Sequence, residues 1–472
     1  MTDLLRIRPT AKMGLTREQF ETIHRTAVEL AIRTGFHVAH SALLERMRGR
    51  PGFRVSGTRI HPSEERVEAY MRSHRARHDE QPPAPDSPPA LYTTDRPLYV
   101  VADDHASIRL VTRQDAIDGA KLVAMLHDRG VRGGTIGLPS DVPAWLAPLE
   151  QILIALRFGR CGGGSSHIFT LWHSQYAARI ARAQGQPFGL SVWMPSPFRL
   201  EGNELDIVLA MEGQFESLAV GSMPLMGITA PMNEIKTWIQ ALAETIGAAA
   251  ILQELYPGIP VDFWPHPKPA DMTTGGYGMG LPEMHLFDVL KSEILPFYGL
   301  QPPWGKSACL GAVTPGPQAQ LERTAAYVIG CLHGYRSFDM AGVLGAGGDV
   351  FSPVQLLLDV ETVSWAERYA RGATWQADED EMDRWVRIAT SDSLFAEDPG
   401  EVAALRSVYR EFRFFRPTTA GAHIAEPRNV FEEAKAEVRR LVAAHNVQPD
   451  EALLREVEAI VDHARRNPPA NA

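Results

Sequence analysis

The alternation of short apolar segments with longer helical ones, which begins at Leu98, constrains the fold of this chain more than any other feature. The short segments are rich in Val, Ile and small residues, as in FGLSVWM (188–194), SLAVGSM (217–223) and IPVDFW (259–264). They lack the polar–apolar alternation of half-exposed strands, so we expect a parallel sheet that is buried on both faces. Seven or eight such units favour a (β/α)8 TIM barrel over an open doubly wound sheet. No G-x-G-x-x-G or Walker A sequence opens a helix, which counts against a nucleotide-binding sheet.

Two smaller parts flank the expected barrel. We expect residues 1–97 to form an N-terminal helical and mixed extension, residues 98–375 to form the barrel, and residues 376–472 to form a helical C-terminal segment. The stretch 76–97 is polar and Pro-rich, which is typical of a linker or a surface excursion.

Local signals predict several individual elements. Thr16 and Gly35 are suited to begin and end a first helix, and FRVSGTRIH (53–61) predicts a hairpin with its turn at Ser56-Gly57. LYVVA and SIRLV (98–111) predict a second hairpin at the start of the barrel. RCGGGSSHIF (160–169) is expected to be one of the barrel strands.

Composition excludes some classes of partner. The 472 residues carry a net charge of −10 without a basic block, so nucleic acid and anionic membranes are poor candidates. No apolar segment approaches the ~20 residues needed to span a bilayer, and the first residues have no apolar signal core. The three cysteines are too far apart in sequence for a disulfide framework. We therefore expect a reduced cytoplasmic protein, and a homo-oligomer.

Several segments match one known family in order and spacing. They include LTREQFETIHRTAVELAIRTGFHV, SMPLMGITAPMNEIKTWIQALAETIGAAAILQELYPGIPV, PADMTTGGYGMGLPEMHLFDVLKSEILPFYGL, PQAQLERT and GVLGAGG. On these motifs the chain resembles the trimethylamine methyltransferase superfamily, which comprises corrinoid-dependent methyltransferases with a TIM-barrel fold. The resemblance implies methyl transfer from a methylated amine to the cob(I)alamin of a separate corrinoid protein. Ordinary residues run through the region where one branch carries pyrrolysine, so the chain resembles the non-pyrrolysine branch, whose substrates are quaternary amines such as glycine betaine.

Two segments depart from the family pattern. The family's Thr-Asp-Ser-Lys run is replaced by Leu310, Gly311, Ala312 and Val313, and its C-terminal loop is reduced to AGAHIAEPRNVF (420–431). Two alternatives therefore stay open. One is a catalytically retired homologue that binds a methylated amine as a sensor or accessory protein, and the other is an enzyme with a different methyl acceptor or a different reaction.

Aromatic side chains are the first candidates for substrate contacts. A quaternary ammonium has no N–H to donate, so it is recognised by aromatic faces in a desolvated pocket. We expect such faces from aromatic residues at predicted strand ends, which are Trp172, Trp193, Phe263, Trp264 and Tyr277. Each of them has a simpler explanation as packing, and the Phe263-Trp264 pair is the preferred choice because it ends a strand.

Polar candidates follow from the carboxylate of a betaine, which needs cationic or N–H donors. His167, His266 and Lys306 lie at predicted strand ends, and Glu283 lies at a helix start that faces the expected barrel mouth. A histidine in such a place is more often structural than a ligand, and an acidic residue in a first helical turn is favoured by the helix dipole.

Glycine-rich loops are the candidates for contact with the corrinoid. Gly275, Gly276 and Gly278, and Gly347 and Gly348 in a second loop, permit close approach of a large planar cofactor or simply form tight turns. Around Cys309 and His266 we find no zinc-binding spacing, and we expect no metal.

No catalytic residue is assigned. A quaternary nitrogen already carries a positive charge, so the departing amine needs no proton. Catalysis then consists of orientation and exclusion of water.

Overall fold

Parallel strands form the wall of a closed barrel in the computed structural model, which describes residues 5–7, 9, 14–78, 88–300, 305–375, 379–409 and 411–470. Two parallel ladders run in the orders β9-β10-β12 and β14-β15-β5-β8. The last strand, β15, is thus hydrogen-bonded to the first, β5, so the series of strands returns to its start as in a (β/α)8 TIM barrel, which is the fold of this chain. The wall strands are β5 (Ala90–Tyr92), β8 (Val131–Arg132), β9 (Gly189–Met194), β10 (Ser217–Ser222), β12 (Val261–Pro265), β14 (Gly305–Ser307) and β15 (Ser337–Asp339).

The eighth position in the wall lies between β8 and β9 and has no regular strand. Residues 160–169 pass through it, where Ser166 N donates to Asp95 Oδ2 at 2.6 Å. The expectation of a strand at 160–169 was therefore wrong. The run of glycine and serine in this segment lacks the β-branched side chains that favour strand pairing.

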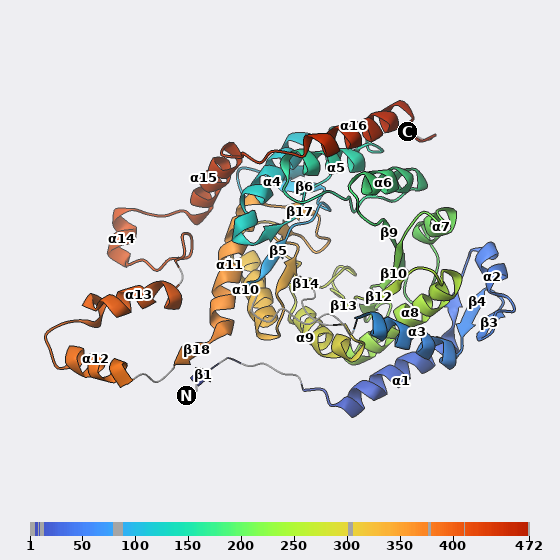
Figure 1. Ribbon diagram of the computed structural model, residues 1–472, viewed down its shortest axis with the longest axis horizontal. Coiled ribbons are helices and arrows are strands. Elements are labelled where there is room, and N and C mark those ends of the chain that lie inside the picture. Colours follow the sequence, from blue (N-terminus) through green and yellow to red (C-terminus); the bar gives the residue numbers. More distant parts are fainter. Residues whose placement is uncertain are drawn as a thin grey trace.

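Helices surround the wall, as Figure 1 shows. The barrel helices are α4 (Arg113–Met125), α5 (Ala147–Phe158), α6 (Leu171–Ala183), α7 (Asn203–Ala210), α8 (Glu234–Leu255), α9 (Pro282–Phe297), α10 (Pro317–Leu332) and α11 (Pro353–Arg371), with a short 3-10 turn at His127–Arg129. The longest, α8, is rich in alanine and buried over most of its length, and Asn233 caps its start by accepting from Lys236 N. Within the described residues, no helix is long and apolar enough to cross a membrane.

The barrel begins earlier than the sequence suggests. Strand β5 lies inside the Pro-rich stretch 76–97, which was expected to be a linker, and its backbone pairs with β15 and β8. The hairpin expected at 98–111 exists as β6 (Tyr99–Val101) and β7 (Ile108–Leu110), but it lies outside the barrel wall. Three residues of strand are too few to show an apolar pattern, so only the pairing reveals β5.

Short strands extend the carboxyl end of the barrel. β6 pairs with β17 (Val350–Phe351), which pairs with β16 (Val343–Leu344), and all of these lie in loops that follow β5 or β15. On the other side, β11 (Leu225–Met226) pairs in parallel with β13 (Lys268–Pro269) and continues the β10–β12 pairing. These pairs fix the loops at the mouth of the barrel.

The N-terminal extension packs beside β12. It contains α1 (Arg17–Thr34), β2 (Phe36–His37), α2 (Ser41–Met47), β3 (Phe53–Ser56), β4 (Arg59–Pro62) and α3 (Glu64–His78). The capping box at Thr16, the end of α1 at Gly35 and the β3–β4 hairpin are all confirmed. Helix α1 packs along α8, where Phe36 fills the space left by Gly247.

The C-terminal segment is helical. It contains β18 (Ala373–Trp375), which pairs with β1 (Leu5–Ile7), and then α12 (Glu379–Ala389), α13 (Pro399–Val408), α14 (Ala420–Ala425), α15 (Val430–Ala443) and α16 (Glu451–Arg466), with a 3-10 turn at Phe395–Glu397. Helix α15 packs on α4 and α11, and α16 packs on α5 and α6. In Figure 1, α12, α13 and α14 lie to one side of the barrel, whereas α15 and α16 run along its helices.

Candidate active site

A cavity of about 340 Å³ opens at the carboxyl ends of the barrel strands. TIM-barrel enzymes carry their active sites on this face, and the volume is at the lower end of small-molecule pockets, which span about 300–1,000 Å³. Its lining includes Arg96, Trp193, Trp238, Trp264, His266, Lys268, Tyr277, Met284, Lys291, Cys309, Asp339 and Gly347.

Part of the cavity lining is aromatic. The ring centroid of Trp193 is 6.1 Å from that of Trp264 and 5.4 Å from that of His266. Gly221 of β10 makes room for this arrangement, because a Cβ there would lie 2.5 Å from the Trp193 ring. Trp238 of α8 reaches the same cavity, and within the described part of the chain its buried Nε1 has no hydrogen-bond partner. These rings offer π faces to a cation that cannot donate a hydrogen bond.

The cavity also carries buried cationic groups. Lys268 is only 6% exposed, and among the described residues the one hydrogen bond of its Nζ is to Met284 Sδ, at 4.0 Å. Lys291 Nζ donates to Gly305 O at 2.8 Å. One carboxylate, Asp339, lines the same cavity, and its buried Oδ1 has no hydrogen-bond partner within the described residues. A buried ammonium without a carboxylate partner is costly, so Lys268 favours an anionic group on the ligand.

Burial sets the protonation of the titratable groups in the cavity. Burial, followed by the charges of Lys291 and Lys268, lowers the pKa of His266 well below its usual value. Burial also lowers the pKa of Lys291 and raises the pKa of the Cys309 thiol. At neutral pH His266 is therefore a neutral ring, and Cys309 is a thiol rather than a nucleophilic thiolate.

The Leu310–Val313 segment, which replaces the family's Thr-Asp-Ser-Lys run, is held by α10. Gly311 N and Ala312 N donate to Glu322 Oε2 at 2.8 and 3.2 Å. The same carboxylate fills the space beside Gly280, where a Cβ would lie 2.4 Å from it. Glu322 thus fixes two mouth loops by backbone contacts, which need no polar side chain from the replaced run.

The structure brings together five of the residues predicted for the site. Trp193, Trp264, His266, Tyr277 and Gly347 all line the cavity. They come from strands or loops far apart in sequence, and the expectation that they converge at the barrel mouth agrees with the geometry.

Two predicted aromatic residues lie elsewhere. Phe263 points away from the cavity and packs against Tyr70, His74 and Tyr298, because alternate residues of β12 face opposite sides. Trp172 packs beside Tyr176, and its Nε1 donates to Asn467 O at 3.0 Å, so its ring secures the C-terminal end of the chain. Of the preferred pair, only Trp264 lines the cavity.

Three predicted polar residues also fall outside the cavity lining. His167 packs against Phe169, and Glu283 lies in the first turn of α9. Lys306 is fully buried and pairs with Asp288, an arrangement that leaves its charge compensated.

Most of the predicted glycines do not line the cavity. Gly275, Gly276, Gly278 and Gly348 are absent from its lining, whereas their neighbours Tyr277 and Gly347 are present. The loop that contains the first three is held by Asp271, which accepts from Thr273 N and Thr274 Oγ1. Asp271 thus acts as a scaffold for this loop.

Sequence reasoning missed the charged residues of the site. Lys268, Lys291 and Asp339 were not predicted, although Lys268 follows His266 by only two residues. That proximity to a predicted ligand at a strand end was the available signal. Lys291 sits in the middle of a helix, where nothing local indicates that it faces a cavity.

A larger cavity, of about 470 Å³, lies between α4 and α15. Its lining comes mainly from helices α4 and α15 rather than from the loops that follow the barrel strands. The smaller cavity at the mouth, which combines aromatic and buried cationic groups, is the better candidate for chemistry.

Comparison with known proteins agrees with this fold and with the sequence resemblance. A profile of the family described as Trimethylamine methyltransferase (MTTB) matches residues 182–411. The chain is 23% identical over 302 residues to the glycine betaine methyltransferase of Desulfitobacterium hafniense (strain Y51), a match that covers 61% of this chain. The chain spans 62% of the length of that relative. The resemblance to the trimethylamine methyltransferase family is thereby confirmed.

Two crystal structures share the fold. One is of the Methanosarcina barkeri monomethylamine methyltransferase (MtmB), and the other is of the hydroxylamine MtmB complex. Each has a TM-score of 0.50 and 12% sequence identity, and each match covers 91% of this chain and 88% of the other.

Proposed function

From this similarity to trimethylamine methyltransferases, we propose that the protein removes a methyl group from a quaternary amine of the glycine betaine type. The acceptor in this proposal is cob(I)alamin carried by a separate corrinoid protein. One observation carries the proposal. A single small cavity joins an aromatic lining to a buried lysine, Lys268, that has no carboxylate partner within the described part of the chain.

The two kinds of group match the two ends of a betaine. The trimethylammonium end is suited to the faces of Trp193 and Trp264, and the carboxylate is suited to Lys268. A simple cation such as tetramethylammonium would leave Lys268 without an anion and would place a positive charge near it. The cavity therefore favours a zwitterion over a simple cation.

The corrinoid would lie across the mouth rather than inside the cavity. A volume of about 340 Å³ holds a small amine but not a corrin ring. The loop after β15 contains Gly347 in the cavity lining and Gly345 and Gly348 at positive φ, so this part of the rim carries little side-chain bulk. When bound, the corrinoid supplies the cobalt nucleophile that accepts the methyl group.

The chain's own part in catalysis is positioning. Aromatic contacts hold the ammonium, and Lys268 fixes the carboxylate. Such orientation contributes as much as ~7–11 kcal/mol in favourable systems. The neutral His266 and the protonated Cys309 are consistent with a reaction that needs no acid or base.

A direct assay tests the proposal. Purified protein is mixed with cob(I)alamin and glycine betaine, and the visible spectrum is followed for conversion to the methylated cobalamin, with choline and tetramethylammonium as matched substrates. We expect turnover with glycine betaine and little with the two cations that lack a carboxylate.

The second candidate, a sensor or accessory protein, is favoured by one observation, the replacement of Thr-Asp-Ser-Lys by Leu310–Val313. Saturable binding of glycine betaine by calorimetry, together with no spectral change for any quaternary amine, would support the sensor and contradict the enzyme.

A further inference from the structure

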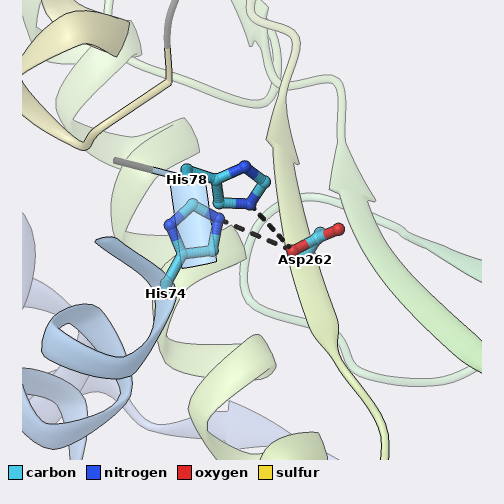
Figure 2. A group of neighbouring side chains, drawn as sticks. All are labelled: His74, His78 and Asp262. Carbon is cyan, nitrogen blue, oxygen red and sulfur yellow. Dashed lines mark hydrogen bonds and ion pairs between the residues drawn. The ribbon is translucent and has the colours of Figure 1, made fainter. Parts of the chain in front are cut away.

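Two histidines of α3 and an aspartate of β12 point toward one another outside the active-site cavity (Figure 2). His74 and His78 are one helical turn apart, so both side chains leave the same face of α3. Asp262 belongs to the barrel strand, beside which the end of α3 lies. Tyr70 Oη and Arg77 Nη2 of the same helix each donate to Val261 O at 3.0 Å.

The spacing of the three side chains suits a tetrahedral metal ion. The distance to Asp262 Oδ1 is 3.7 Å from His74 Nε2 and 3.4 Å from His78 Nε2. Each of the three residues offers a ligand atom within 4.8 Å of the others. Two ligands about 2.0–2.1 Å from a tetrahedral Zn²⁺ lie about 3.3–3.4 Å apart. Small side-chain movements would therefore complete the coordination.

His74 supplies an independent reason to expect a ligand. Its side chain is fully buried, and neither ring nitrogen has a hydrogen-bond partner among the described residues. Its ring centroid is 4.4 Å from that of His78 and 4.7 Å from that of Phe263. Buried polar nitrogens are almost always satisfied. An imidazole that makes no hydrogen bond among the described residues, and that faces a second histidine and a carboxylate, therefore favours a bound group.

The surrounding charges leave room for a cation. Arg77 carries a positive charge close to Asp262, with its Nη2 3.4 Å from Asp262 Oδ1, but the same Nη2 also donates to Val261 O. Asp262 has a second carboxylate oxygen, so it can serve Arg77 and a metal together.

We propose that His74, His78 and Asp262 bind a divalent transition-metal ion, with Zn²⁺ as the best match to two imidazoles and one carboxylate. The ion joins the end of the N-terminal extension to barrel strand β12, two residues before Trp264. Its fourth ligand is water, because His78 and Asp262 are partly exposed. Sequence reasoning, which expected no metal, overlooked the His-x-x-x-His pair in HRARH, and the carboxylate lies 184 residues further on from His78.

Metal titration of the full chain tests this site. The protein is stripped with a chelator and titrated with Zn²⁺ against a chromogenic indicator, and Co²⁺ is added separately to record its visible absorption. We expect one equivalent of tightly bound Zn²⁺ and a Co²⁺ spectrum of the tetrahedral type. The H74Q/H78Q variant should lose the Zn²⁺ binding and the Co²⁺ spectrum. A matched H127Q/H423Q variant, which removes two histidines elsewhere, should keep both properties.

Two further single variants separate loss of the metal site from misfolding of the chain. H78Q and D262N change partly exposed side chains, and each should weaken Zn²⁺ binding at least tenfold and abolish the rise in Tm that Zn²⁺ gives the unchanged protein. Wild-type protein that binds no Zn²⁺ at micromolar concentration, or an H78Q variant that binds it as tightly as wild type, would overturn the proposal. Neither readout depends on methyl transfer, so the metal site and the proposed function can fail separately.

Discussion

At the scale of single residues, the candidate site is defined by which side of a strand each side chain faces. Trp264 lines the cavity, whereas its neighbour Phe263 is buried among the rings of the N-terminal extension. Trp238 lies within helix α8, yet it lines the same cavity as Trp264 and is no control for it. A valid comparison therefore needs a tryptophan that lies elsewhere.

Trp264→Ala should weaken binding of glycine betaine by about 3–30-fold, since a cation–π contact contributes roughly 0.5–2 kcal/mol. The matched control is Trp365→Ala, because Trp365 is similarly exposed but stacks on Tyr369 of α11. Isothermal titration calorimetry of both variants checks the prediction. Equal losses of affinity would count against the assignment of the aromatic lining.

Lys268→Met should weaken glycine betaine binding by about 10–100-fold, because a charge-assisted hydrogen bond contributes about 1.5–3 kcal/mol. Binding of choline, which has the same head group and no carboxylate, should change less than about threefold by the same reasoning. The control is Lys236→Met in the first turn of α8, which leaves the cavity lining unchanged. A parallel loss for both ligands would contradict a carboxylate-specific role for Lys268.

At the scale of elements, one helix organises the ends of two strands. Arg323 of α10 is fully buried and donates to Ala308 O, Met340 O and Val343 O, just beyond β14 and β15. Its Nε lies 3.1 Å from Asp359 of α11, which is also fully buried. Burial raises the pKa of Asp359, although the guanidinium opposes this effect. The pair thus links two helices to the loops at the barrel mouth.

Arg323→Met should lower the free energy of unfolding by about 3–5 kcal/mol, because it leaves Asp359 buried without a counter-charge. Arg33→Met, which removes an exposed ion pair with Glu29 on α1, should cost no more than ~0.5 kcal/mol. Urea denaturation of the two variants gives the comparison. A loss of less than about 1 kcal/mol for Arg323→Met would show that the Arg323–Asp359 pair does not stabilise the fold in this way.

At the scale of the whole molecule, Glu437 joins the C-terminal segment to itself and to the barrel. Its side chain is 1% exposed and contacts Arg440 at 2.7 Å, Arg413 at 2.6 Å and Arg129 at 3.8 Å. Hydrogen bonds from Arg440 and Arg413, with their charges, lower the pKa of Glu437 to about 2. A lowered carboxyl pKa stabilises the folded state above the unfolded pKa of 4.5, and that stability is lost as pH falls toward 2.

Glu437→Gln should therefore cost stability at neutral pH and little in acid. We expect a loss of about 1–2 kcal/mol at pH 7, after allowance for screening of the partly exposed arginines. The difference from wild type should shrink toward zero at pH 2.5. Urea denaturation at pH 7, 4 and 2.5 measures it, with Glu456→Gln on the exposed side of α16 as the control. A difference that stays constant across this pH range would contradict the linkage.

Local chemistry in the sequence determined much of the fold. The capping box at Thr16, the end of α1 at Gly35, the β3–β4 hairpin and most of the helix–strand alternation depend on neighbouring residues, so they could be predicted. The confirmed barrel follows from counting those units. Residues 160–169 and β5 could not be predicted, because strand pairing with distant partners decides whether such short segments become part of the wall.

Tertiary structure decided the composition of the sites. The sequence indicated Trp193, Trp264, His266, Tyr277 and Gly347 because side chains after barrel strands converge at one face. The sequence did not indicate that Lys291 lines the cavity or that Phe263 points away from it. It also did not indicate that Asp262 lies close to His74. Those relations depend on which helix face packs inward and on which strand edge an N-terminal helix covers, and long-range packing alone sets both.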